Sequence, residues 1–274
     1  MIKRRKWLCV IVILLAAVFC LIQNNWIMVS HYTYASSKIG EETEGYCIVQ
    51  ISDLHNKLFG AGQSYLMNKI QECEPDIIVV TGDVADSNHT NIGKSLLFFE
   101  EAVKIAPVYY VTGNHEHWLS VSEKEELWQG IEKAGVIRLD DECRQIATTE
   151  EHGFTIIGLD DRSLSDDTLE EVMEQVPENA FSLLLAHEPQ YIEKYADCGV
   201  DLVLSGHAHG GQVRLPLLGG LVAPNQGLLP RYTEGIHTQG NTSMIISRGL
   251  GNSVIPLRVF NRPEIVCVEL TKES

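Results

Sequence analysis

The stretch from Asp76 to Asp86 reads DIIVVTGDVAD and places two carboxylates directly after a run of apolar, mostly β-branched residues. A run of this length and composition is typical of a strand buried in a parallel sheet. Gly82 follows the run and lets the chain turn sharply before Asp83. Open α/β sheets bind ligands beyond the carboxyl ends of such strands, so this stretch predicts both a fold class and the position of a site.

The same arrangement recurs along the chain. Short apolar runs predict strands at residues 47–51, 77–80, 108–111, 154–159, 181–186, 202–204, 244–247 and 265–270. Apolar residues at three- and four-residue spacing predict amphipathic helices at residues 64–73, 95–106, 123–134 and 168–175. This alternation predicts an α/β fold with a largely parallel sheet. Residues 210–240 hold seven glycines and three prolines without a helical period, so we expect a long loop region there, with room for hairpins.

Five of the expected strands end next to side chains of metal-ligating types. These candidate ligands are Asp53, His55, Asp83, Asn114, His187, His207 and His209. Residues i and i+2 of an extended segment share a face, so both members of the pairs at 53/55 and 207/209 can point to one centre. Carboxylates mixed with neutral imidazoles suit Mn, Fe or Zn. Seven ligands exceed the needs of one tetrahedral ion, and we expect two divalent ions that share a bridging carboxylate, with Mn preferred over Fe and Zn.

The motif order resembles that of the calcineurin-like metallophosphoesterases. The chain has DLH at 53–55, GDVAD at 82–86, GNHE at 113–116, a single histidine at 187 and GHAH at 206–209. The resemblance covers about residues 46 to 270 and implies a four-layer α/β/β/α sandwich. It implies that one ion is held by Asp53, His55 and His209, and the other by Asn114, His187 and His207, with Asp83 bridging.

The resemblance also implies a reaction. A metal-bridging hydroxide would attack a phosphodiester or pyrophosphate in line with the leaving oxygen. His115 is expected to stay off the metals as a catalytic residue that stabilises the transition state or protonates the leaving alkoxide. Asp86 and Glu116 are expected to orient the ligands. A finer similarity, to exported bacterial phosphodiesterases such as the UDP-2,3-diacylglucosamine pyrophosphatases, suggests a lipid-linked or cell-envelope substrate.

Four further side chains are candidate substrate contacts. They are His117, Arg162, Arg231 and Arg248. A surface or packing role for the histidine, and a structural ion pair for each arginine, is the alternative in this acidic protein.

The N-terminus predicts a membrane anchor. Residues 3–6 are all basic, and residues 7–29 are long and apolar enough for one crossing, with a tryptophan near each end. The basic residues should stay cytoplasmic, which makes the chain a single-pass protein of the cell membrane with its catalytic domain outside. The expected divisions are an anchor at 1–35, a short linker at 36–45 and a catalytic domain at 46–274. The alternative is a signal peptide cleaved after residue 35, where the sequence is TYA.

Charge and cysteine content limit the partners. The formal net charge is −16, and the four basic residues at 3–6 leave −20 on the rest, which argues against binding long nucleic acid. We expect a phosphorylated small-molecule or lipid-linked substrate and no obligate protein partner. The alternatives are a nucleotide phosphodiesterase or nuclease, and a non-catalytic metal-dependent surface protein, which would not need His115. The five cysteines outside the apolar span are expected to be free thiols, with one disulfide as the alternative.

Overall fold

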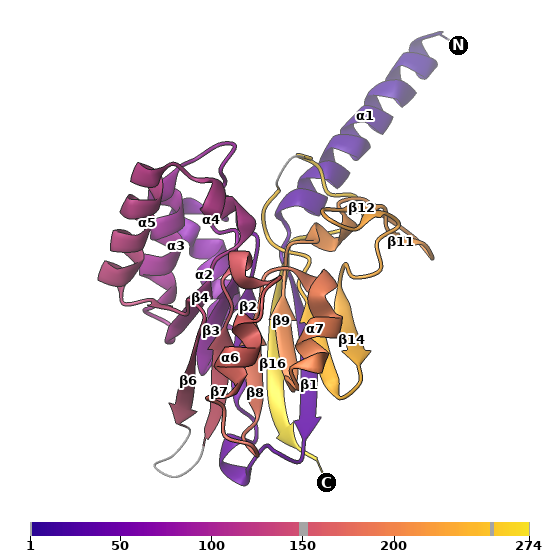
Figure 1. Ribbon diagram of the computed structural model, residues 1–274. Coiled ribbons are helices and arrows are strands. Elements are labelled where there is room, and N and C mark those ends of the chain that lie inside the picture. The colour runs from indigo at the N-terminus through magenta and orange to yellow at the C-terminus, as the bar shows by residue number, and fades with distance from the viewer. Residues whose placement is uncertain (1, 148–152, 253–254, 274) are drawn as a thin grey trace.

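The computed structural model describes residues 2–147, 153–252 and 255–273, and two six-stranded mixed sheets form its centre (Figure 1). The first sheet has, in spatial order, β1 (Met28–Ser36), β16 (Glu264–Lys272), β2 (Cys47–Ile51), β3 (Ile77–Thr81), β4 (Val108–Val111) and β5 (Ile137–Arg138). The second has β14 (Gly235–Gln239), β15 (Thr242–Ile246), β9 (Leu202–Ser205), β8 (Ser182–Leu185), β7 (Gly153–Gly158) and β6 (Glu142–Ala147). In the first sheet β2, β3 and β4 run parallel to one another and β16 runs antiparallel to β2. In the second sheet the inner strands β15, β9, β8 and β7 run parallel.

Helices cover the outer face of each sheet. The helices α2 (Ser64–Gln71), α3 (Ile92–Ala102) and α5 (Val121–Ala134) pack on the first sheet, and α6 (Thr168–Met173) and α7 (Ile192–Asp197) pack on the second. The inner faces of the two sheets bury a separate apolar cluster between them. This is the expected four-layer α/β/β/α sandwich. Its remaining helices are α1 (Ile2–Asn25), α4 (Asn114–Trp118) and the short 3-10 turns η1 (Glu41–Thr43), η2 (Ala61–Gln63), η3 (Asp161–Ser163), η4 (Pro189–Tyr191) and η5 (His209–Gly211).

One buried polar side chain joins the two sheets at the end where the candidate ligands lie. Gln50 on β2 donates to Thr81 Oγ1 on β3 over 2.9 Å and to the carbonyl oxygen of Ser205 on β9 over 2.8 Å. Its side chain is fully buried. A buried amide with satisfied donors fixes the register of its neighbours, so this bond sets the two strand ends at a defined separation.

Helix α1 ends sooner than the sequence predicts. Its segment from Trp7 to Asn25 has a mean hydropathy of 2.5, enough by length and composition for one membrane crossing, although a signal sequence has the same character. Residues 28–36, expected in the anchor and linker, form β1 instead and pair with β16 in parallel. Exposed and half-buried side chains alternate from His31 to Ser36, which suits a strand with one face on a core.

The loop region expected at 210–240 contains short hairpins. Strands β10 (Arg214–Leu215) and β11 (Gly219–Gly220) form one, and β12 (Val222–Ala223) and β13 (Gly227–Leu228) form the other. Residues 235–239 leave the loop as β14, antiparallel to β15.

Candidate metal centre

The seven candidate ligands meet at one edge of the sandwich, beyond the carboxyl ends of β2, β3, β4, β8 and β9. Three groups of side chains have ligand atoms that all lie within 4.8 Å of one another, and one of them, His55, Asp86 and His115, shares His55 with another group. We call Asp53, His55 and His209 the first cluster, and Asp83, His187 and His207 the second cluster. The first cluster contains the residues of one ligand set that the resemblance implies, and the second contains two residues of the other set together with Asp83, the expected bridge.

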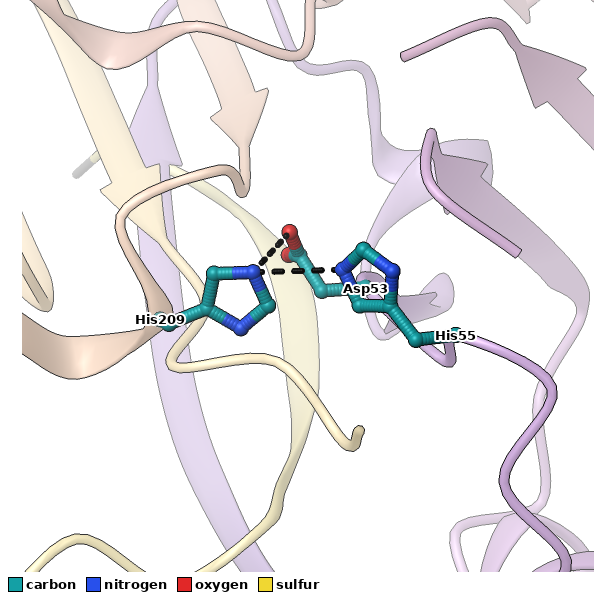
Figure 2. Close-up of side chains that lie close together, drawn as sticks. All are labelled: Asp53, His55 and His209. Carbon is teal, nitrogen blue, oxygen red and sulfur yellow. Dashed lines mark hydrogen bonds and ion pairs between the residues drawn. The ribbon is translucent and has the colours of Figure 1, made fainter. Parts of the chain in front are cut away.

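In the first cluster, three side chains converge, two from the loop after β2 and one from the loop after β9 (Figure 2). Nε2 of His209 lies 3.2 Å from Nε2 of His55 and 3.5 Å from Oδ1 of Asp53. The Asp53 carboxylate is held in place by the Ser52 hydroxyl at 2.6 Å and by the His207 backbone N–H at 3.1 Å. This arrangement aims two imidazole nitrogens and one carboxylate oxygen at a common point.

In the second cluster, a backbone contact fixes the tautomer of one histidine. Nδ1 of His187 lies 2.7 Å from the carbonyl oxygen of Thr81, which can only accept, so Nδ1 carries the proton. Nε2 of His187 lies 3.3 Å from Oδ2 of Asp83 and 3.2 Å from Nδ1 of His207, and in the neutral ring it would present its lone pair to a cation. Asp83 Oδ2 also lies 3.6 Å from Nε2 of His55 in the first cluster. Asp83 thus stands between the clusters.

Asn114 supplies a further oxygen beside the second cluster. It opens α4, lies in the cavity lining with Asp83 and His207, and is buried. Among the described residues its Oδ1 atom has no hydrogen-bond partner. A buried amide oxygen without a partner is costly, and coordination to a cation would satisfy it.

The backbone is strained where the ligands are held. Five of the seven candidates have positive φ angles, between 47° and 64°: Asp53, His55, Asp83, His207 and His209. Side-chain-bearing residues rarely adopt this region, and strain of this kind concentrates at functional sites. Gly206 shows the crowding that enforces it, because a Cβ atom there would lie 1.9 Å from Ser52 Oγ.

Burial keeps three of the imidazoles neutral. It lowers the pKa of His55 to about 4 and that of His207 to about 3, and it lowers the pKa of His209 well below its usual value. Burial would also lower the pKa of His187, but the Asp83 carboxylate outweighs it and raises that pKa well above its usual range. Neutral imidazoles and carboxylates together are a donor set that fits divalent transition metals.

His115 lines the cavity beside the clusters without belonging to either. Its Nδ1 accepts from the Ser87 backbone N–H at 3.2 Å, and Asp86 Oδ1 lies 3.4 Å from the same atom. Its ring packs edge to face on that of His55, with the centroids 4.6 Å apart. Because a backbone N–H can only donate, the neutral ring carries its proton on Nε2.

Glu116 holds the loops that carry the ligands. Its carboxylate accepts from the backbone N–H groups of Asp83, Ala85 and Gly113 at 2.8 to 2.9 Å. It therefore ties the end of β3 to the end of β4, which agrees with the orienting role expected of it.

A cavity of about 220 Å³ opens beside the second cluster. The sequence did not single out three of its lining residues, Trp118, Glu188 and Asn225. The Asn225 side-chain amide lies 3.3 Å from His207 Nε2 and 3.1 Å from Glu188 Oε1. Of these three residues only Glu188 had a local feature in the sequence that could have indicated it, because it directly follows the candidate ligand His187. The cavity is lined by Asp83, Asn114, His115, Trp118, Glu188, His207, His209, Pro224 and Asn225.

The four expected substrate contacts do not line this cavity. His117 pairs with Asp160, with Nε2 2.9 Å from Oδ1. Arg162 is exposed, and Arg231 is exposed with its guanidinium 5.0 Å from the Tyr232 ring centroid. Arg248 is buried and forms an ion pair with Glu264 at 3.0 Å. Arg248 therefore forms a structural ion pair, which was the alternative to a substrate contact.

The cysteine thiols are free, as expected. Three of them gather at the other end of the first sheet. Cys47 Sγ lies 3.3 Å from Cys267 Sγ and 3.3 Å from the carbonyl oxygen of Cys73.

Comparison with known proteins supports this geometry. Residues 47–211 match the family model described as calcineurin-like phosphoesterase. The chain is similar to the uncharacterized metallophosphoesterase YkuE of Bacillus subtilis, with 31% identity over 91% of this chain and 87% of that protein. It is 32% identical to YkoQ of Bacillus subtilis over 80% of this chain and 81% of that protein. It is 30% identical to the phosphodiesterase YaeI of Escherichia coli over 81% of each chain. With two clusters of metal-ligating side chains at the edge of its sandwich, the chain belongs to the calcineurin-like phosphoesterases and is a metal-dependent phosphoester hydrolase.

Proposed function

We propose that this protein is a membrane-anchored phosphodiesterase or pyrophosphatase that uses two divalent ions, with Mn preferred. Its substrate would be extracytoplasmic and lipid-linked or derived from the cell envelope. The observation that carries the proposal is the position of Asp83, whose Oδ2 atom lies within 3.6 Å of a histidine nitrogen from each cluster. A carboxylate in that position suits a bridge between two ions.

The residues divide into holders of metal and groups that act on substrate. Asp53, His55 and His209 would hold one ion, and Asn114, His187 and His207 the other. Two bound divalent ions lower the pKa of water and neutralise charge on phosphoryl oxygens. The strained backbone and the bonds from Ser52, Thr81 and Glu116 keep the ligands in place, so little reorganisation is needed during the reaction.

His115 is the proposed proton donor to the leaving oxygen. The Ser87 backbone N–H donates to Nδ1 and so directs the ring proton to Nε2, which would be the nitrogen that donates to the leaving oxygen. A positioned general acid contributes about 10²–10⁴-fold to the rate.

The cavity suits a phosphoryl group whose larger substituent lies outside. Its volume of about 220 Å³ is below the range of about 300–1,000 Å³ that encloses a drug-sized ligand. A substrate with a large lipid or sugar portion would therefore keep most of that portion beyond the cavity. The printed name of YaeI, a phosphodiesterase, supports a diester as the bond to test first.

Strand β1 supports an anchor that stays attached. Cleavage after Ala35 would remove almost all of β1 from the first sheet, together with the bond from Ser30 Oγ to Glu264 Oε1 at 2.5 Å. It would also remove Tyr34, which stacks on Phe181 of the second sheet. The folded domain thus depends on residues directly after α1, and we propose a retained, single-pass anchor with residues 3–6 in the cytoplasm.

The test uses the full chain purified in detergent and loaded with Mn²⁺. The substrates are bis(4-nitrophenyl) phosphate, 4-nitrophenyl phosphate, a nucleoside cyclic phosphate and a lipid pyrophosphate in mixed micelles. We expect hydrolysis of the diester or the pyrophosphate, abolished by chelation and restored by Mn²⁺. Preference for the cyclic nucleotide would support the nucleotide phosphodiesterase instead. A metal-loaded chain that hydrolyses none of them would contradict the proposal.

A further inference from the structure

Four large apolar side chains project from the two hairpins beside the catalytic cavity. We call Leu217, Leu218, Leu228 and Leu229 the leucine rim. Leu217 is fully exposed, Leu228 is 83% exposed, and the other two are more than 60% exposed. Leu217 and Leu218 are adjacent in the chain, as are Leu228 and Leu229, and the hairpins that carry the two pairs follow one another directly. Exposed apolar groups that gather on a folded domain mark a surface that contacts another apolar phase.

The leucine rim and the cavity share one segment of chain. Pro224 and Asn225 line the cavity and lie in the turn of the β12–β13 hairpin, where Leu228 pairs with Val222. Only a few residues therefore separate the cavity wall from the exposed leucines. Whatever covers the rim lies next to the cavity.

The strand register places the end of α1 at the same edge of the sandwich. Met28, the first residue of β1, pairs with Glu264, and Val266 two residues later pairs with Gln50, which is near the end of β2. The start of β1 is thus next to the ligands that follow β2. Figure 1 shows α1 leaving the molecule on the side of β11 and β12.

Side-chain contacts hold α1 to this edge. The Asn252 amide donates to Asn24 Oδ1 at 2.9 Å, and the Asn261 backbone N–H donates to Gln23 Oε1 at 3.1 Å. The rings of Phe19 and Phe260 lie 5.4 Å apart at an edge-to-face angle. Phe260 is itself 55% exposed, so the apolar surface continues from the anchor onto the domain.

The charge of this part of the chain differs from that of the rest. Residues 202–263 contain one carboxylate, Glu234, and five arginines, in a protein whose formal net charge is −16. One of these arginines, Arg231, is exposed and lies two residues after Leu229. A surface of leucines with an adjacent arginine and few carboxylates suits the interface of an anionic bilayer, which repels carboxylates.

We propose that the leucine rim lies in the surface of the same bilayer that α1 crosses, and that it holds the mouth of the catalytic cavity at the level of the lipid headgroups. The proposal rests on the retained anchor of the proposed function. A phosphoester in a lipid headgroup would then reach the cavity while its acyl chains stay in the bilayer.

The test is photocrosslinking of the full chain in vesicles of phosphatidylcholine and phosphatidylglycerol. The photoreactive residue p-benzoylphenylalanine replaces Leu218, Leu229 or, as the control, Thr238. Thr238 is exposed on β14 at the opposite end of the second sheet, because its partner Ser243 pairs with Leu202 at the start of β9. Hydrolysis of bis(4-nitrophenyl) phosphate in detergent checks that each variant is folded.

We expect lipid adducts, detected by mass spectrometry, at positions 218 and 229 and none at 238. If the chain floats with the vesicles but gives no lipid adduct at positions 218 and 229, the leucine rim proposal alone is overturned. The same holds if position 238 gives as much lipid adduct as positions 218 and 229. Adducts at 218 and 229 that join two copies of the chain instead of lipid would also overturn it. Failure of the chain to float with the vesicles would overturn the anchor as well, and the detergent assay reports on catalysis separately.

Discussion

Oδ2 of Asp83 lies 3.3 Å from Nε2 of His187, and both side chains are fully buried. The His187 imidazole that faces it holds the pKa of the Asp83 carboxyl well below its usual value, against the effect of burial. A cation bound between the Asp83 carboxylate and the neighbouring imidazoles would form coordinate bonds to them in place of their present contacts with one another. Metal binding and folding are therefore coupled at this residue.

The first prediction concerns metal and stability. Mn²⁺ at about 100 times its dissociation constant should stabilise the chelator-treated chain by about 2.7 kcal/mol, because the folded ligands bind it and the unfolded ones do not. Asp83→Asn should lose most of this stabilisation. Its turnover should also fall by more than roughly 100-fold, which is the loss typical when a residue that only hydrogen-bonds to a metal ligand is replaced. Thermal unfolding, bound-metal analysis and diester hydrolysis measure these effects. Asp167→Asn, at an exposed position, is the control. Full metal content in Asp83→Asn would contradict the bridge.

The second prediction separates metal binding from proton transfer. His115→Gln should keep the ions of the wild type and lose about 10²–10⁴-fold in kcat, because glutamine cannot donate a proton to the leaving oxygen. The loss should be smallest for substrates with good leaving groups, which need little protonation. The exposed His31 provides the matched control as His31→Gln. A variant at 115 that lost metal, or turned over normally, would show that the assigned role is wrong.

The third prediction concerns pH. Burial, opposed by His187 and reinforced by Glu188 and Asp83, raises the pKa of Asp161 from 3.8 to about 7. The folded chain keeps this proton while the unfolded chain loses it, so stability is full below about pH 4 and falls as pH rises toward 7. Asp161→Asn should remove this fall, which solvent screening limits to about 2 kcal/mol. Urea unfolding of the chelator-treated chain between pH 4 and 8 measures it, with Asp167→Asn as the control. An unchanged pH slope in Asp161→Asn would count against this account.

The fourth prediction concerns the carboxylate that joins β3 to β4. Glu116→Gln keeps one acceptor oxygen for three backbone donors, so it should lower stability by about 2 kcal/mol. The loosened loops should also weaken metal binding by about 10–100-fold. Unfolding curves and metal titrations check both effects. The exposed Glu125 on α5 gives the control Glu125→Gln. Wild-type metal affinity in a destabilised Glu116→Gln would limit Glu116 to a structural role.

The fifth prediction concerns the thiols. The hydrogen bond with Cys267 lowers the pKa of Cys47 against the effect of burial, which makes Cys47 the reactive thiol of the pair. Oxidised glutathione should join Cys47 to Cys267 and stabilise the chain by about 2–4 kcal/mol. Peptide mapping without reductant identifies the bond, and Cys198→Ser should leave it unchanged. A bond from Cys73 instead would show that the preferred pair is wrong.

The sequence predicts the clusters well because their geometry follows from chain order. Asp83 and His187 each follow a parallel strand, and the carboxyl ends of parallel strands meet at one edge. The extended alternation expected at 53/55 and 207/209 is wrong in its backbone geometry, because all four residues have positive φ angles. His207 and His209 also lie in different clusters, a separation that the spacing alone does not predict.

Other elements depend on partners far along the chain. Residues 28 and 29 end the apolar stretch of the N-terminus, and only pairing with β16, more than 200 residues later, makes residues 28–36 a strand. Arg248 seemed available to substrate because Glu264, which neutralises it, is not adjacent in sequence. Asn225 reaches the site through the fold of two glycine-rich hairpins that carry no periodic signal.

The connection between α1 and β1 consists of Trp26 and Ile27, and Ile27 is buried in the core of the first sheet. In the proposed anchored protein, a connection this short would give the catalytic domain no tether on which to move away from the bilayer. An anchored copy would therefore meet lipid-linked substrates by lateral diffusion within the plane of the membrane. Its encounter rate would depend on the surface density of substrate and on membrane fluidity, and dilution of the surrounding solution would leave that rate unchanged.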